Sequence, residues 1–393
     1  MKRLMLFIGL LLLFAAEILR VYFIMPFPGS QVKNTIALAY WISNNIIWLR
    51  ILGIALIILP LIDIFKNRKI WPKVLLSLII VLYGIIFFFF NFRFEADKMF
   101  YPPKEKTQAT AAVNKVKTSQ LVIGVAINGQ AKAYPIQIIG YHHRVMDTVG
   151  GTPVMITYCT VCRTGRVFSP LINGKMQSFR LVGMDHFNAM FEDAATGSWW
   201  QQATGIAIAG PLKGTALKEL PSAQFTLATW LRKYPNSLVM QPDTNFKKDY
   251  ADLAGYDKGT IKGSLEHTDS ASWKRKSWVI GVIHDKASKA YDWNQLVKTT
   301  VINDSLGGLP IMLTLENDTA SFHVYNRVVN GTSLIFKSTS NNELTDNSTH
   351  STWNMDGLCI NGTLKGKQLS TVQAYQEFWH SWRNFHPNTT RYN

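Results

Sequence analysis

The residues of this 393-residue chain that are best suited to chemistry are two cysteines separated by two residues and two adjacent histidines upstream of them. Cys159 and Cys162 can each present a sulfur to one metal ion, and His142 or His143 would complete a Cys2His or Cys2His2 ligand set. Thiolate and imidazole ligands together suit Cu(I) or Zn(II). The leading hypothesis is therefore that these four residues bind copper or zinc.

Three other interpretations of the cysteine pair stay open. An exposed thiolate of low pKa and its partner would form a dithiol–disulfide couple, as in a thiol-disulfide oxidoreductase. One cysteine could instead act as a nucleophile, with His142 as its base and Asp147 orienting that histidine. The pair could also be a structural disulfide. Covalent haem attachment is disfavoured, because Arg163 and not a histidine follows Cys162.

Other side chains near the pair are weaker candidates. His186 is a candidate ligand or base. Arg163 and Arg166 flank the cysteines and could lower their pKa values, although we favour a solvated surface position for both. Cys359 has an alanine as its counterpart in the duplication described next, so we expect a small buried residue there.

A long internal duplication indicates the elements that position these residues. The matched residues, at one constant spacing, include Lys132, Tyr134, Asp147 and Gly150 in the first copy and Lys289, Tyr291, Asp304 and Gly307 in the second. At that spacing Cys159 corresponds to Glu316, and the two histidines correspond to threonines. Shared residues report a common scaffold, so only the first copy carries the candidate site.

Both copies have a β-rich pattern. The segments predicted as strands in the first copy are residues 121–127, 131–134, 154–158, 166–168 and 178–182. Asn128-Gly129 and Asn173-Gly174 predict hairpin turns, because both positions of a type I′ turn need positive φ. The second copy repeats the plan with Asn330-Gly331.

An amphipathic helix is predicted near the end of each copy. Apolar residues recur at helical spacing over residues 227–234 and again over residues 375–382. The predicted domains are a membrane anchor (1–94), a first half with the cysteines (95–240), a charged connector (241–277) and a second half without them (278–393). The predicted fold class is α+β and β-rich, with two tandem similar halves and three N-terminal transmembrane helices.

Three apolar stretches near the N-terminus predict the membrane anchor. Residues 4–24, 46–64 and 74–90 are each close to the ~20 residues that cross the hydrocarbon core. Glu17 and Arg20 lie one helical turn apart in the first stretch, and we expect them to pair with each other.

The placement of lysine and arginine predicts the orientation of the anchor. Basic residues precede the first stretch and fill the loop between the second and third, whereas the loop between the first and second has only Lys33. By the positive-inside rule the N-terminus is cytoplasmic and everything after Phe94 is extracytoplasmic. We expect a multi-pass protein of the cytoplasmic (inner) membrane.

The net charge of +16 does not indicate nucleic-acid binding, because no basic run interleaved with aromatic residues and no recognition motif accompanies it. Part of the excess positive charge lies in the loop between the second and third apolar stretches. The rest is spread over the residues after Phe94, including Lys247-Lys248. A generally solvated basic surface is the favoured interpretation, and apposition to an anionic membrane surface is the alternative.

Four motifs in fixed order carry a family resemblance. They are residues 158–162 (Tyr-Cys-Thr-Val-Cys), 142–151, 196–202 and 210–214. With them the chain resembles, from about Met99 to Tyr392, a prokaryotic domain-of-unknown-function family numbered 3179. The family pattern usually has Cys-Pro-x-Cys and a Glu after its histidine, whereas Thr160 and His143 stand there in this chain. The loss of that proline weakens a thioredoxin-like interpretation.

Together these observations predict a membrane-anchored, extracytoplasmic protein that binds a soft transition metal through Cys159, Cys162, His142 and His143. The expected partners are the membrane and a cell-envelope protein, not nucleic acid. The alternatives are a thiol-disulfide oxidoreductase of the cell envelope and a non-catalytic envelope binding module.

Overall fold

The computed structural model describes residues 1–392 and falls into two compact units. The first unit comprises residues 1–101, 177–201 and 206–216. The second comprises residues 102–176, 202–205 and those from 217 onward.

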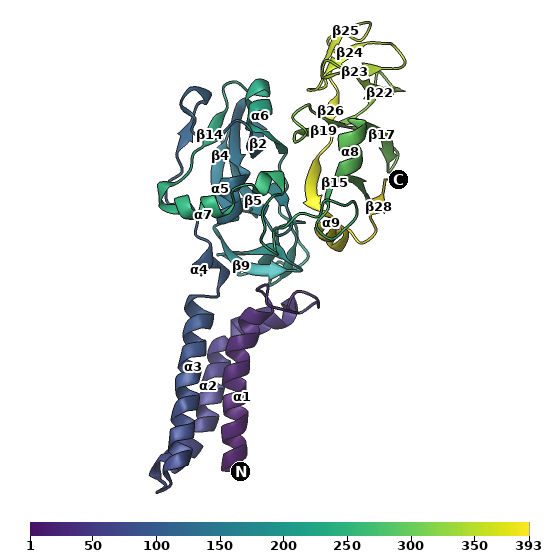
Figure 1. Ribbon diagram of the computed structural model, residues 1–393. Coiled ribbons are helices and arrows are strands. Elements are labelled where there is room, and N and C mark those ends of the chain that lie inside the picture. The colour runs from purple at the N-terminus through teal and green to yellow at the C-terminus, as the bar shows by residue number, and fades with distance from the viewer. Residues whose placement is uncertain (393) are drawn as a thin grey trace. The chain divides into compact units, whose positions relative to one another are not determined.

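Three long helices begin the first unit and run alongside one another (Figure 1). They are α1 (Lys2–Tyr22), α2 (Ile36–Lys66) and α3 (Ile70–Phe92), followed by the short α4 (Ala96–Met99). All three are long and apolar enough to cross a membrane, which confirms the predicted spans as helices of membrane-spanning character.

The predicted pairing of Glu17 with Arg20 is wrong. Glu17 is fully buried and accepts from Arg50 Nε of α2 at 2.6 Å, whereas Arg20 Nη1 donates to Glu95 Oε1 at 2.6 Å. Asn91 of α3 joins them by donating to Glu17 Oε2 at 2.9 Å. Charged groups among apolar helices face the bundle interior and pair across it, so each residue takes a partner outside α1.

A small sheet in the same unit packs on the connection between α1 and α2. Its strands, in the order β12-β11-β10-β9, are Ala207–Ala209, Trp199–Gln201, Asn188–Asp193 and Phe179–Asp185. Met184 N donates to Ile24 O at 2.6 Å, and Phe187 N donates to Gln31 Oε1 at 3.1 Å. These bonds tie the sheet to the end of the helix bundle.

The second unit begins with two sheets and a hairpin. The first sheet, in the order β1-β14-β3-β2-β13, contains Gln108–Ala109, Leu238–Met240, Gln130–Pro135, Leu121–Ile127 and Ala223–Thr226. The second contains β4 (Arg144–Val149), β5 (Thr152–Cys159) and β6 (Thr164–Phe168), and the hairpin pairs β7 (Leu171–Ile172) with β8 (Lys175–Met176). Its helices are α5 (Ile136–His142), α6 (Leu227–Lys233) and α7 (Lys247–Asp252).

The rest of the second unit, from β15 onward, is also built from small sheets and short helices. One sheet contains β27 (Ala374–Phe378), β15 (Trp278–His284), β16 (Ala287–Asp292) and β28 (Thr390–Arg391), and another contains β17 (Val301–Leu306), β18 (Leu309–Leu315), β19 (Phe322–Asn326) and β26 (Ser370–Thr371). A third contains β22 (Phe336–Ser338), β23 (Glu343–Asp346), β24 (Thr352–Asn354) and β25 (Cys359–Asn361), beside the pair β20 (Val328–Val329) and β21 (Thr332–Ser333). The helices are α8 (Trp293–Thr299) and α9 (Trp379–Phe385).

The α+β, β-rich class with three N-terminal apolar helices is confirmed. The five predicted strands fall on β2, β3, β5, β6 and β9, and the Asn-Gly turns have positive φ at both positions. The element order strand, strand, helix, strand, strand, strand occurs in β2 to β6 and again in β15 to β19. The arrangement as two tandem halves and the domain boundaries stay predictions.

The helix predicted over residues 375–382 is partly wrong. Tyr375 and Phe378 lie in strand β27, and α9 begins only at Trp379. The apolar residues of a buried strand that runs directly into a helix happened to match helical spacing. The helix predicted over residues 227–234 is confirmed as α6.

Candidate functional site

The Cys-x-x-Cys occupies the end of the β5–β6 hairpin. Cys159 is the last residue of β5 and pairs with Thr164, the first residue of β6. Arg163 N donates to Thr160 O at 3.3 Å, and Arg163 itself has a φ of 55°. Cys162 therefore lies in a tight hairpin loop and not at the start of a helix, so no helix dipole is available to stabilise its thiolate.

Both sulfurs are fully buried and contact each other. Cys159 and Cys162 each have 0% of their surface exposed, and a hydrogen bond joins their side chains. Burial raises the pKa of the Cys162 thiol well above its ordinary value, and the bond with Cys159 raises it further. The Ser381 hydroxyl and the Lys276 ammonium oppose that shift. The structure thus holds a dithiol shielded from water, in which the Cys162 thiol is hard to ionise.

Lys276 brings a buried cation to this dithiol. Its Nζ donates to Val161 O, between the two cysteines, at 2.6 Å and also to Leu265 O. Burial lowers the pKa of Lys276 to about 8, and negative charge on the two cysteines or on Glu266 opposes this lowering. The sequence showed this residue only as part of a basic run, because nothing local places residue 276 beside residue 161.

Two residues of α9 complete the surroundings of the dithiol. His380 Nε2 lies 3.1 Å from Val161 O, and burial lowers the pKa of His380 to about 3, with Lys276 adding to the effect. The Ser381 hydroxyl donates to Glu377 Oε2 at 2.9 Å and bonds to Cys162. Just before α9, Phe378 N donates to Cys162 O at 2.9 Å. A segment more than 200 residues downstream therefore closes the site.

The favoured surface position of Arg163 and Arg166 is wrong, because both are buried. The guanidinium of Arg163 lies 3.8 Å from the ring centroid of Trp278, and its Nε donates to Gln376 Oε1 at 2.9 Å. Arg166 Nη2 pairs with Glu377 at 2.7 Å. Both arginines therefore attach the hairpin to strand β27.

Each of the two histidines has a hydrogen-bond partner outside the Cys-x-x-Cys. His142 ends α5, where its Nε2 lies 2.7 Å from the hydroxyl of Tyr250. His143 follows with a φ of 56°, and its Nδ1 lies 2.9 Å from Tyr158 O. Burial lowers the pKa of His143 to about 4. Within residues 1–392 no group of three or more His, Cys, Asp or Glu side chains is placed to hold a metal ion.

The remaining candidates have local partners. Asp147, predicted to orient His142, instead binds Lys132 Nζ at 3.0 Å and the Tyr134 hydroxyl at 2.8 Å. His186 pairs with Asp185 at 2.6 Å, and this hydrogen bond raises the pKa of His186. Cys359 is buried in β25, as predicted.

The corresponding hairpin, β18–β19, carries an ion-pair network where the first has thiols. Glu316 takes the place of Cys159, and its two oxygens accept from Arg232 of α6 at 2.6 and 2.8 Å. His323 Nε2 lies 2.9 Å from Glu316 Oε1. These bonds hold the pKa of Glu316 down at about 2, in spite of burial, which is the largest effect and raises it.

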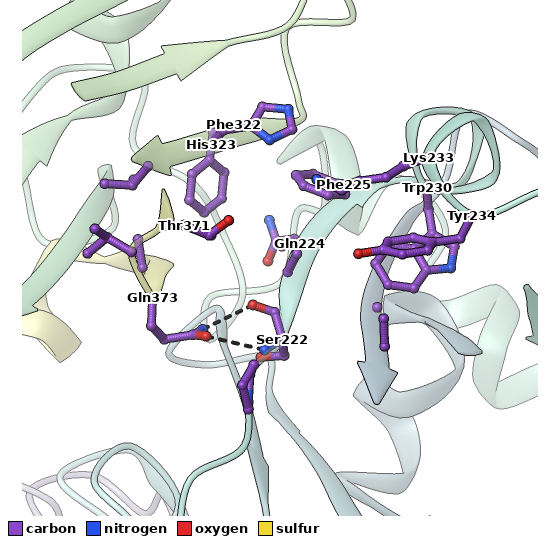
Figure 2. A pocket seen from close by; sticks show the side chains of 17 residues that line it. Ser222, Gln224, Phe225, Trp230, Lys233, Tyr234, Phe322, His323, Thr371 and Gln373 are labelled. Atoms are coloured by element: carbon purple, nitrogen blue, oxygen red, sulfur yellow. Dashed lines mark hydrogen bonds between the residues drawn. The ribbon is translucent and has the colours of Figure 1, made fainter. Parts of the chain in front are cut away.

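His323 of this ion-pair network lines a pocket with a volume of about 280 Å³. Figure 2 shows Phe225, Trp230 and Tyr234 on one side of the pocket and Phe322 on the other. At its base the side chain of Gln373 binds the backbone N–H and C=O of Ser222, at 3.2 and 3.1 Å. Gln373 thereby binds the backbone just before strand β13 in the way that a neighbouring strand would.

The comparisons with known proteins identify a family and no activity. No curated protein and no solved structure matches the chain. A family model described as a protein of unknown function (DUF3179) matches residues 102–389, which include the cysteine hairpin and every element that closes it. The chain therefore belongs to the DUF3179 family of proteins of unknown function.

Proposed function

We propose that this membrane-anchored protein binds one Cu(I) ion between Cys159 and Cys162. Two thiolates suffice for Cu(I), which is soft and forms stable two-coordinate complexes with sulfur ligands. The two side chains already contact each other in a pocket shielded from water. The histidines are not needed as ligands in this arrangement.

The observation that carries the proposal is the Lys276 ammonium beside the two sulfurs. Replacing two thiol protons with one Cu(I) leaves the pair with a single negative charge, and a buried charge is costly unless it is paired. Lys276 Nζ, fixed on Val161 O at 2.6 Å, supplies the opposite charge. A disulfide, in contrast, is neutral and offers this buried cation no such compensation.

Zinc fits these residues less well than copper. A structural Zn(II) site uses four protein ligands and a catalytic site three. In the part of the chain that the structure describes, no three candidate ligands converge. We therefore propose Cu(I) rather than zinc as the metal ion.

We also propose that the dithiol lies on the extracytoplasmic side of the membrane. Three helices of membrane-spanning character precede it, and the basic residues cluster at the N-terminus and between α2 and α3. The positive-inside rule then leaves the residues after α3 outside.

The test is a competition for Cu(I) between the full-length protein in detergent and a chromophoric Cu(I) chelator, without oxygen. We expect the wild type to withdraw one equivalent of Cu(I), and Cys159→Ser and Cys162→Ser each to abolish this. Lys276→Met should weaken binding by about tenfold or more, because the site keeps its charge and loses the counter-charge. Melting temperatures of all variants identify any that fail to fold.

Cys359→Ser is the matched control, since Cys359 is also buried but lies in β25. It should bind Cu(I) as the wild type does. The proposal fails if the wild type leaves all Cu(I) with the chelator, or if Cys359→Ser loses as much binding as Cys159→Ser.

A dithiol–disulfide couple is the second candidate, favoured by the contact between the two thiols. Exchange with a protein partner needs an attackable sulfur, whereas both sulfurs are fully buried. Thiol counting by maleimide labelling, before and after treatment with diamide, decides between the candidates. Rapid loss of two thiols in a protein that takes up no Cu(I) would favour the redox couple.

A further inference from the structure

A second, separate hollow in the same unit is surrounded by lysines. It has a volume of about 720 Å³ and lies between the segment before β2, helix α5 and helix α7. Lys115 and Lys117 line it from the first segment, Lys247 from α7 and Lys258 from the turn beyond. All four lysines are exposed to solvent.

These four cations have little opposing charge. Within residues 1–392, none of the four has a carboxylate within ion-pair distance. The only acidic residue that lines the hollow is Asp257. Cations that converge on a concave surface produce a stronger local potential than the same charges spread over a convex one.

Asp257 also has an unsatisfied atom. Its Oδ2 accepts from Leu121 N at 3.2 Å, whereas its buried Oδ1 has no hydrogen-bond partner among the described residues. Burial raises the pKa of this carboxyl, against the lowering effects of Arg163 and Lys258. A buried polar atom without a partner calls for a ligand or a water.

We propose that this hollow binds a phosphate-bearing polyanion. Lysine ammonium groups are strong point-charge partners for phosphate oxygens, and several of them suit an anion with more than one charge. A free polyphosphate and the phosphate headgroup of an anionic lipid share this chemistry. Tyr250 also lines the hollow, and its hydroxyl lies 2.7 Å from Nε2 of His142.

The experiment is isothermal titration calorimetry on the full-length protein in nonionic detergent. The probes are sodium tripolyphosphate, soluble dihexanoyl phosphatidylglycerol and, as the uncharged counterpart, dihexanoyl phosphatidylcholine. The test variant replaces Lys115, Lys117, Lys247 and Lys258 with glutamine. We expect saturable binding of an anionic probe by the wild type, weakened about tenfold or more in this variant and by added salt.

The matched control replaces four exposed lysines of the second half, Lys298, Lys337, Lys365 and Lys367, with glutamine, which changes the net charge equally. It should bind as the wild type does. Binding of tripolyphosphate alone would identify a free polyanion as the ligand, and binding of phosphatidylglycerol but not phosphatidylcholine would identify a lipid headgroup. The proposal is overturned if neither anion binds, or if both quadruple variants lose affinity equally.

Discussion

The β5–β6 and β18–β19 hairpins occupy corresponding places in the chain but end in opposite chemistry. The first ends in two buried thiols beside a buried ammonium, and the second in an ionised carboxylate between a guanidinium and an imidazole. In both, the hairpin end is fully enclosed, with Cys159 and Glu316 at most 3% exposed. One local scaffold thus supports either a buried dithiol or a buried ion pair, depending on what packs against it.

Each hairpin is completed by a strand and helix from the other part of the chain. Phe378 N, at the junction of β27 and α9, donates to Cys162 O. At the corresponding junction of β13 and α6, Thr226 Oγ1 donates to Asp318 of the second hairpin at 2.8 Å. The side chains Gln224 and Gln376 meet between these two strands at 2.8 Å. The contacts are reciprocal, so a change in one hairpin is expected to affect the opposite strand and helix.

The largest effect should come from neutralising the second hairpin. Glu316→Gln keeps the shape of the side chain but leaves His323 and Arg232 without their carboxylate. Breaking a buried pair by removing one partner costs about 3–5 kcal/mol, and we expect about 2–4 because Arg232 is half exposed. Urea unfolding, followed by tryptophan fluorescence, measures the loss.

Glu343→Gln is the control for that change, because Glu343 lies in β23, downstream of the β18–β19 hairpin, and is only partly buried. Its free energy of unfolding should stay within about 0.5 kcal/mol of the wild type. Equal losses in the two variants would mean that Glu316 is no more important than a surface carboxylate.

The two hairpins should also differ in their response to acid. The pKa of Glu316 is held at about 2 in the folded protein, against an ordinary value of 4.5, so its stabilising effect is complete above pH ~4.5 and is lost as the pH falls toward 2. The stability difference between wild type and Glu316→Gln should therefore shrink over that window. For Cys162→Ser the difference from wild type should stay constant there, because burial raises the pKa of the Cys162 thiol far above this pH window. A constant difference for Glu316→Gln as well would show that Glu316 is not ionised in the fold.

The sequence predicted what depends on local patterning. Alternation and β-branched residues placed β2, which spans residues 121–127 as predicted, and paired Asn-Gly residues placed the hairpin turns. The three apolar stretches were recognisable from length and composition alone. These signals are contained within about 20 residues, so no tertiary information is needed to interpret them.

The surroundings of the cysteines were not predictable in the same way. Lys276, His380 and Ser381 reach the dithiol from beyond residue 240, and the sequence carries no local sign of such contacts. The histidines were predicted as ligands because they precede the cysteines, yet α5, which was not predicted, directs His142 to Tyr250. Adjacency in sequence showed which residue types were available, whereas the packing of distant segments determined their partners.

A pair of buried glycines offers the sharpest comparison between the two parts. Gly124 in β2 lies under the ring of Trp230, and Gly281 in β15 lies under that of Trp382; a Cβ at either position would overlap the indole. The two tryptophans are anchored alike, through Nε1 to Ser237 Oγ at 2.7 Å and to Thr389 Oγ1 at 2.8 Å. Each indole is therefore held in place and has little freedom to move aside.

Gly124→Ala and Gly281→Ala should accordingly destabilise the protein by similar amounts, about 1–3 kcal/mol each, as overpacking of a dense core does. Urea unfolding measures both, with Gly129→Ala as a control for the loss of a glycine without crowding, since nothing lies near a Cβ there. Gly129 has a φ of 77°, so that control carries its own backbone strain and sets a conservative baseline. If only one of the two buried substitutions is costly, the indole in the other part can yield, and the two strand-helix elements are not equivalent in rigidity.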